Sequence, residues 1–140
     1  MHASDHQPWL RTVILVGVLY FVVGIAFGTF AGWTASNQMR FTWRLLAFIV
    51  SGVAFAIHIG FEHKHFGNSA FITALRVCLA VAVGAFALAV AANVHGQRVG
   101  STHQRLLVFA LVAWPVMTAV PAFVVALVAA SLLGLKRRST

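Results

Sequence analysis

The sequence predicts an all-α membrane protein in which four transmembrane helices form an up-down-up-down bundle with short loops. First, 61% of its residues are hydrophobic and only 9% are charged, whereas soluble domains have about 25% charged residues. Second, the apolar residues gather in four segments, each long enough to span ~30 Å of hydrocarbon as a helix. Third, short polar stretches join the segments, which favours antiparallel neighbours. Residues 1–140 are therefore expected to form a single transmembrane domain.

The first helix is expected over about residues 12–33, a stretch without any charged side chain. Because this stretch is longer than the ~7–15 apolar residues of a signal peptide, we interpret it as a retained membrane helix. The second helix is expected over 43–61, where His58 is the only ionisable residue after Arg44 at its start. The third and fourth are expected over 71–94 and 106–135.

Local signals refine the last two helices. Asn68 and Ser69 are candidates for the N-cap of the third helix. The fourth helix contains Pro115 and Pro121, which remove backbone hydrogen bonds and predict a kink. Proline is common in membrane helices, so we interpret the kink as structural and not as a transport cavity.

The basic residues predict the orientation. Four crossings place both termini and the middle loop on one side of the membrane, with six of the ten Lys and Arg residues: Arg11, Lys64, Arg76, Lys136, Arg137 and Arg138. The other side has Arg40, Arg44, Arg98 and Arg105. The positive-inside rule then favours cytoplasmic termini. The abundance of Ala and Val, together with tight loops, favours a bacterial cytoplasmic (inner) membrane.

Other classes of protein receive little support. In a soluble protein, the net charge of +8 would suggest binding to nucleic acid. Here the basic residues lie between apolar segments, where they can bind lipid headgroups. We therefore expect no nucleic-acid partner. The sequence has no Ser–His–Asp set of plausible geometry, no CxxC pair and no phosphate-binding glycine loop. It is not expected to be an enzyme.

Rows of small residues are the clearest pattern. They occur in the first and second helices: Gly17, Gly24, Gly28 and Gly32, then Gly52, Ala56 and Gly60. In lipid, such rows allow the backbones of two helices to approach closely. We predict that they face protein, whether in the same chain, a second copy or another subunit.

A histidine cluster offers a second candidate site. His58, Glu62 and His65 lie at i, i+4 and i+7, and imidazole and carboxylate groups at this spacing can bind a divalent metal. We favour the alternative, in which this segment is a wet interfacial loop and Glu62 lies at the surface, paired with Lys64 or Arg76. The Arg76 side chain is then expected to reach towards the headgroups.

Haem is a further alternative, since one histidine from each of two helices can bind its iron. His58 and His95 are expected at opposite faces of the membrane, ~30 Å apart, so they do not form a pair. His58 with His2, or His95 with His103, are the remaining combinations. No cofactor is predicted.

We therefore favour a non-catalytic accessory or structural subunit in the lipid bilayer. It is expected to pack with the membrane helices of other subunits or to self-associate. The alternative is a small oligomeric channel or transporter for an ion or small solute; a metal- or haem-binding membrane protein is the second alternative. Transport is less favoured because the middles of the expected helices offer Ser51, Thr29 and Thr118 but no charge.

Overall fold

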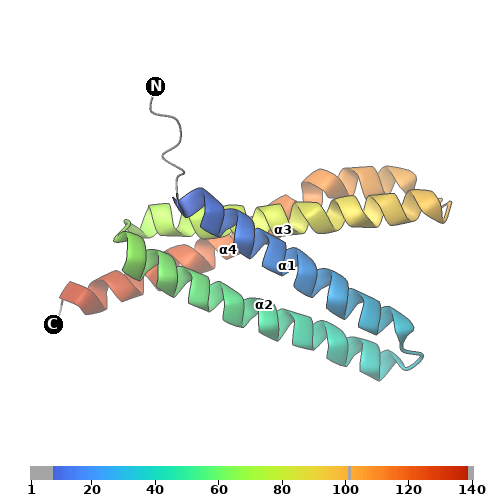
Figure 1. Cartoon of the computed structure of the whole chain (residues 1–140), viewed down its shortest axis with the longest axis horizontal. Helices are drawn as coiled ribbons and strands as arrows, with labels where there is room; N and C mark the ends of the chain where they lie inside the picture. Colours follow the sequence, from blue (N-terminus) through green and yellow to red (C-terminus); the bar gives the residue numbers. More distant parts are fainter. Residues whose placement is uncertain (1–7, 101, 139–140) are drawn as a thin grey trace.

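The computed structural model describes residues 8–100 and 102–138, with side chains up to residue 135. This part of the chain forms four helices and no strand, so the predicted all-α class is confirmed. The helices are α1 (Pro8–Trp33), α2 (Asn37–Phe66), α3 (Ala70–Arg98) and α4 (Gln104–Arg138). Consecutive helices run antiparallel (Figure 1). All four are long and apolar enough to cross a membrane.

The helices are longer than expected, most clearly at the end of α2. This helix continues to Phe66, five residues past its expected end, and the connection to α3 shrinks to residues 67–69. The last turn of α2 contains His63, Lys64 and His65, and basic groups near a helix C-terminus interact favourably with its dipole. Gly67 then ends the helix in the left-handed conformation, with φ of 58°. Polar residues that we assigned to a loop are therefore helical.

The two local predictions for α3 and α4 have different outcomes. Ser69 is the N-cap of α3, and its side chain accepts a hydrogen bond of 3.4 Å from the backbone N–H of Ile72. α4 continues as one helix through Pro115 and Pro121. Between them, the Thr118 hydroxyl donates to the carbonyl of Trp114 at 2.9 Å. The size of a kink at the prolines stays a prediction.

The four helices form two hairpins that cross and then diverge (Figure 1). α3 is central, because it packs along α4 and also against α1, whereas the backbones of α1 and α4 do not approach each other closely within the described residues. The buried residues of α2 are His58, Ile59 and Glu62, all in its last third. We call the end with the α2–α3 turn the closed end. The end with the α1–α2 and α3–α4 turns, which lie apart, is the open end.

Two glycines fix the crossing of α1 and α3. A Cβ atom at Gly84 would lie 2.7 Å from Tyr20 Cβ and 2.9 Å from the carbonyl oxygen of Gly17. A Cβ atom at Gly17 would likewise lie 3.2 Å from the carbonyl oxygen of Ala80. Distances this short leave no room for a side chain, so the two backbones approach as closely as glycine allows.

Most of the apolar surface of these helices faces outwards. Large apolar side chains are exposed along the length of all four helices, for example Leu15, Phe48, Phe86 and Val112. In water such a surface would be strongly unfavourable, whereas in lipid it needs no protein partner. The helix lengths and this exposed surface are those of a multi-pass membrane protein.

Candidate functional site

A buried carboxylate lies at the closed end of the molecule. Glu62, one turn before the end of α2, has no exposed surface. Its Oε2 atom lies 3.2 Å from Nη1 of Arg76 in α3, which donates a hydrogen bond to it. The Asn68 side chain, in the α2–α3 turn, donates a longer one of 3.5 Å to the same oxygen. The charge of Glu62 is therefore compensated inside the protein, across two helices.

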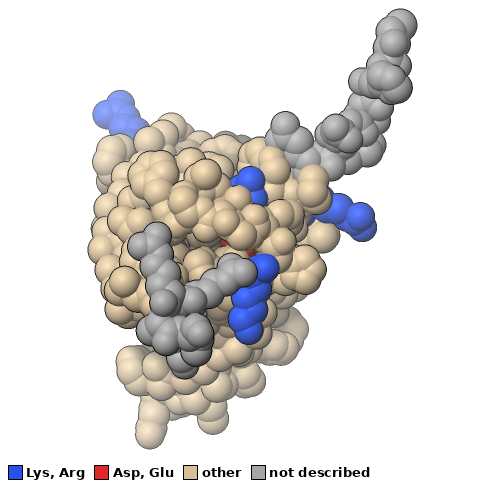
Figure 2. Space-filling view, turned by 90° about the vertical axis from the view of Figure 1, so that its left-hand side faces the viewer, with Lys and Arg blue, Asp and Glu red and all other residues tan. Residues whose placement is uncertain are grey.

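Aromatic rings enclose the other half of this ion pair. The guanidinium carbon of Arg76 lies 5.2 Å from the centre of the Trp9 ring in α1 and 5.4 Å from the centre of the Phe66 ring in α2. Both distances are within the range of cation–π attraction. Arg76 thus joins the start of α1, the end of α2 and the start of α3. Figure 2 looks onto this end and shows several blue basic groups but almost no red, as expected for a covered acid.

Further polar atoms are buried beside the ion pair without a hydrogen-bond partner in the described structure. They are both ring nitrogens of His58 and of His63, together with Glu62 Oε1. His58 Nε2 and Glu62 Oε1 are 3.9 Å apart, too far for a hydrogen bond. His63 faces α4, because a Cβ atom at Gly134 would lie 4.0 Å from its ring. All four helices therefore contribute to this end.

One expectation about these residues is wrong. Glu62 was expected in a wet surface loop but has no exposed surface, whereas the reach of Arg76 towards the headgroups stays a prediction. Because α2 continues as a helix past Glu62, that side chain points at α3 and the ion pair forms in the interior. Of the two pairings considered for Glu62, the one with Arg76 is correct and Lys64 is exposed.

The structure brings together two members of the expected metal-binding set, His58 and Glu62, but not His65. His65 is exposed and its ring stacks on Phe61, with centroids 4.5 Å apart. In the part of the chain that is described, no three His, Cys, Asp or Glu residues are placed to hold a metal ion. His95 and His103 are exposed at the open end, and His2 lies outside the described residues. A metal or haem site stays an alternative without geometric support in the described residues.

The predicted small-residue rows separate into two groups. Gly17 and Gly24 face α3, and a Cβ atom at Gly24 would lie 2.7 Å from Leu88. At Gly28, Gly32, Gly52 and Gly60 a Cβ atom would meet nothing within 4 Å, and Ala56 is exposed. The two rows therefore do not pack on each other within this chain. Whether the outward group faces another protein stays a prediction.

Sequence reasoning missed three residues that join helices. Gly84 is the partner of Gly17, and a signal for it existed, since it interrupts a run of larger apolar residues in the middle of α3. Asn93 is 7% exposed, and its side-chain amide donates to the carbonyl of Leu107 in α4. A lone amide in an apolar helix is such a signal. Trp9 has no such signal, because its contact with Arg76 depends on tertiary structure.

No protein-family model matches the chain, and no curated protein or solved structure is significantly similar to it. The site must therefore be interpreted from its geometry. One charged group is neutralised by another, the arginine is enclosed by rings, and the two groups come from different helices. This arrangement is suited to holding helices together at one end.

Proposed function

We propose that the protein is a non-catalytic membrane protein of the bacterial cytoplasmic membrane, with cytoplasmic termini. In this proposal it acts as an accessory or structural subunit by packing α2 on the membrane helices of other subunits. α2 is held to α3 and α4 at the closed end and to α1 by contacts such as Trp43 with Phe30. The side of its first two thirds that faces away from α1 is free to meet such partners.

One observation supports this proposal above the others. Before His58, α2 buries no residue in its own chain, yet its small-residue row, Gly52 and Ala56, faces outwards with open space beside the glycine. A helix that faces only lipid gains nothing from such a row, because lipid chains pack well against larger side chains. A row without bulky groups instead favours close approach of another helix.

The test compares two chemically identical substitutions, Ala56→Leu in the row and Ala92→Leu at an exposed position of α3. Each variant is purified from its native membrane in mild detergent, and the mass of its complexes is measured by native mass spectrometry. Ala56→Leu should reduce the fraction in complexes with other subunits about tenfold, equivalent to about 1.4 kcal/mol. Ala92→Leu should not. Equal behaviour of both variants would contradict the proposal.

Permeation of an ion or small solute by an oligomer is the second candidate function. It is favoured by the buried ionisable groups Glu62 and His58, because such groups within membrane helices often belong to ion pathways. A pure homo-oligomer that gives flux in proteoliposomes, with the flux lost on Glu62→Gln, would support this candidate over the subunit function.

A further inference from the structure

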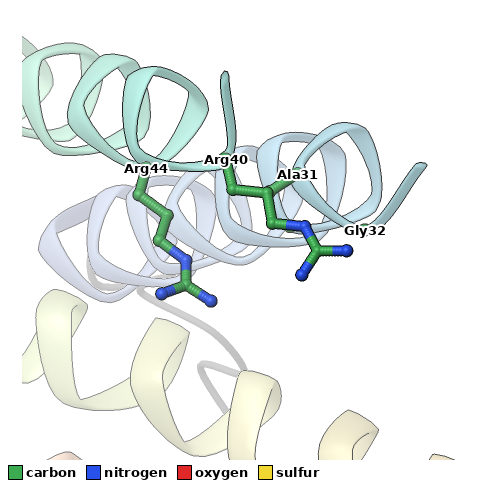
Figure 3. Close-up of a pocket in the computed structure, with 5 residues that line it drawn as sticks. Ala31, Gly32, Arg40 and Arg44 are labelled. Atoms are coloured by element: carbon green, nitrogen blue, oxygen red, sulfur yellow. The ribbon is translucent and has the colours of Figure 1, made fainter. Parts of the chain in front are cut away.

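A hollow at the open end lies beneath two arginines. It is lined by Gly28, Ala31 and Gly32 of α1 and by Arg40 and Arg44 of α2, and its volume is about 270 Å³. The hollow exists because neither glycine has a side chain, and a Cβ atom at either one would meet nothing within 4 Å. Figure 3 shows both arginine side chains leaving α2 on the same side, with Arg40 beside Ala31 and Gly32.

The two arginines are held near each other at this position. They are four residues apart, so they share one face of α2. Arg40 Nε donates a 2.8 Å hydrogen bond to the carbonyl of Thr34, which leaves its two terminal nitrogens available. Arg44 has no hydrogen bond or ion pair with any described residue. Like charges at this spacing repel each other, so an anion between them would be stabilising.

Among the described residues no carboxylate is placed to supply that anion. The chain contains only two acidic residues, Asp5 and Glu62, and Glu62 is bound to Arg76 at the opposite end. α2 adds to the positive potential at the hollow, because its first turn has no acidic residue and the Ser36 side chain makes no capping hydrogen bond. The N-terminus of a helix attracts anions through its dipole and its free N–H groups.

Aromatic contacts hold the hollow in place and set its depth in the membrane. The Trp43 ring lies 5.1 Å from the Phe30 ring and 6.0 Å from the Phe27 ring, between centroids, which holds α2 against α1 beside the arginines. Trp33 is 81% exposed at the end of α1. Exposed tryptophan at a helix end is typical of the headgroup layer. The hollow therefore lies where phosphate groups are concentrated.

We propose that Arg40 and Arg44, above Gly28 and Gly32, bind a phosphate group. Arginine binds phosphate oxygens with two parallel N–H donors. The volume of the hollow is slightly below the ~300–1,000 Å³ typical of drug-sized ligands. It thus fits a phosphate with a few adjoining atoms. The phosphate comes from an anionic lipid headgroup or from a soluble phosphate, and the same contacts serve both.

The test uses the full chain, delipidated in detergent, and measures bound phosphatidylglycerol by native mass spectrometry. The double variant Arg40→Gln/Arg44→Gln should bind about 30-fold more weakly, since each arginine near an anionic membrane contributes roughly fivefold. The matched control, Arg98→Gln/Arg105→Gln, removes two exposed arginines at the same end of the molecule and should bind as the unaltered protein does.

Competition with inorganic phosphate identifies the source of the ligand. If millimolar phosphate leaves the bound lipid in place, the site holds a headgroup; if it displaces the lipid only when both arginines are present, the site accepts soluble phosphate. Gly32→Leu keeps both charges but fills the hollow, so it should also weaken binding. Equal loss in the two double variants, or full binding by Gly32→Leu, would overturn the proposal.

Discussion

The closed and open ends of the molecule use arginine in opposite ways. At the closed end Arg76 is only 19% exposed, paired with Glu62 and enclosed by two rings. At the open end Arg40 and Arg44 are exposed, and no described carboxylate lies near them. Within the described residues, the one carboxylate is therefore paired with Arg76 at the closed end.

This difference teaches how the fold is held together. Where helices converge, a charge must be paired inside the protein, and the pair then joins the helices that supply it. Where the hairpins diverge, the arginines contribute little to folding and are available for binding. Stability and binding are therefore expected to reside at different ends, and the following predictions test that separation.

The largest effect is expected from breaking the buried pair. Arg76→Ala leaves the fully buried Glu62 without its partner and should lower the free energy of unfolding by about 3–5 kcal/mol. Glu62→Ala should also destabilise, but less, because Arg76 keeps its contacts with the rings. Unfolding in detergent micelles measures both changes.

Arg44→Gln is the matched control at the open end, and its effect on unfolding should be within about 0.5 kcal/mol. The double variant Glu62→Leu/Arg76→Met removes both charges and should recover much of the lost stability, since a well-packed apolar pair can replace a buried ion pair. Similar losses in Arg76→Ala and Arg44→Gln would remove the distinction between the two ends.

The sequence predicts the open end better than the closed end, for a physical reason. Local hydrophobicity alone predicts the four helices. The excess of basic over acidic residues predicts that most arginines have no partner in the chain. The burial of Glu62 could not be predicted in this way, because it depends on α2 continuing to Phe66 and on Arg76 facing it from another helix. Likewise the sequence shows the small-residue row on α1. Its partner, Gly84, could not be predicted, because it depends on which face of α1 meets α3.

An intermediate effect is expected where α1 crosses α3. Gly84→Ala places a methyl group 2.7 Å from Tyr20 Cβ and 2.9 Å from a backbone oxygen of α1, so the helices must separate. We expect a loss of about 1–3 kcal/mol in unfolding free energy. Gly28→Ala makes the same chemical change where nothing lies within 4 Å, and it should not destabilise. If both variants unfold alike, α1 does not pack on α3 as described.

The smallest effect is expected at Asn93, which joins α3 to α4 on the side of the open end. Its side chain donates to the carbonyls of Ala89, at 3.2 Å, and of Leu107 in α4. Because hydrogen bonds between membrane helices contribute about 0.6 kcal/mol on average, Asn93→Leu should cost about that much. Gln97→Leu removes an exposed amide one turn later and should cost less.

Hydrogen exchange at the backbone amides shows which part of the molecule loses stability in Asn93→Leu. Asn93 is 17 residues from Arg76 along α3, about 25 Å at 1.5 Å per residue, and sites so far apart act almost independently on stability. Faster exchange in Asn93→Leu should therefore be confined to the α3–α4 turn, while amides around Glu62 and Arg76 keep their protection. An equal rise in exchange at both ends would contradict this expectation. It would mean that the closed end needs the Asn93 side chain, at the other end of α3, as well as the ion pair.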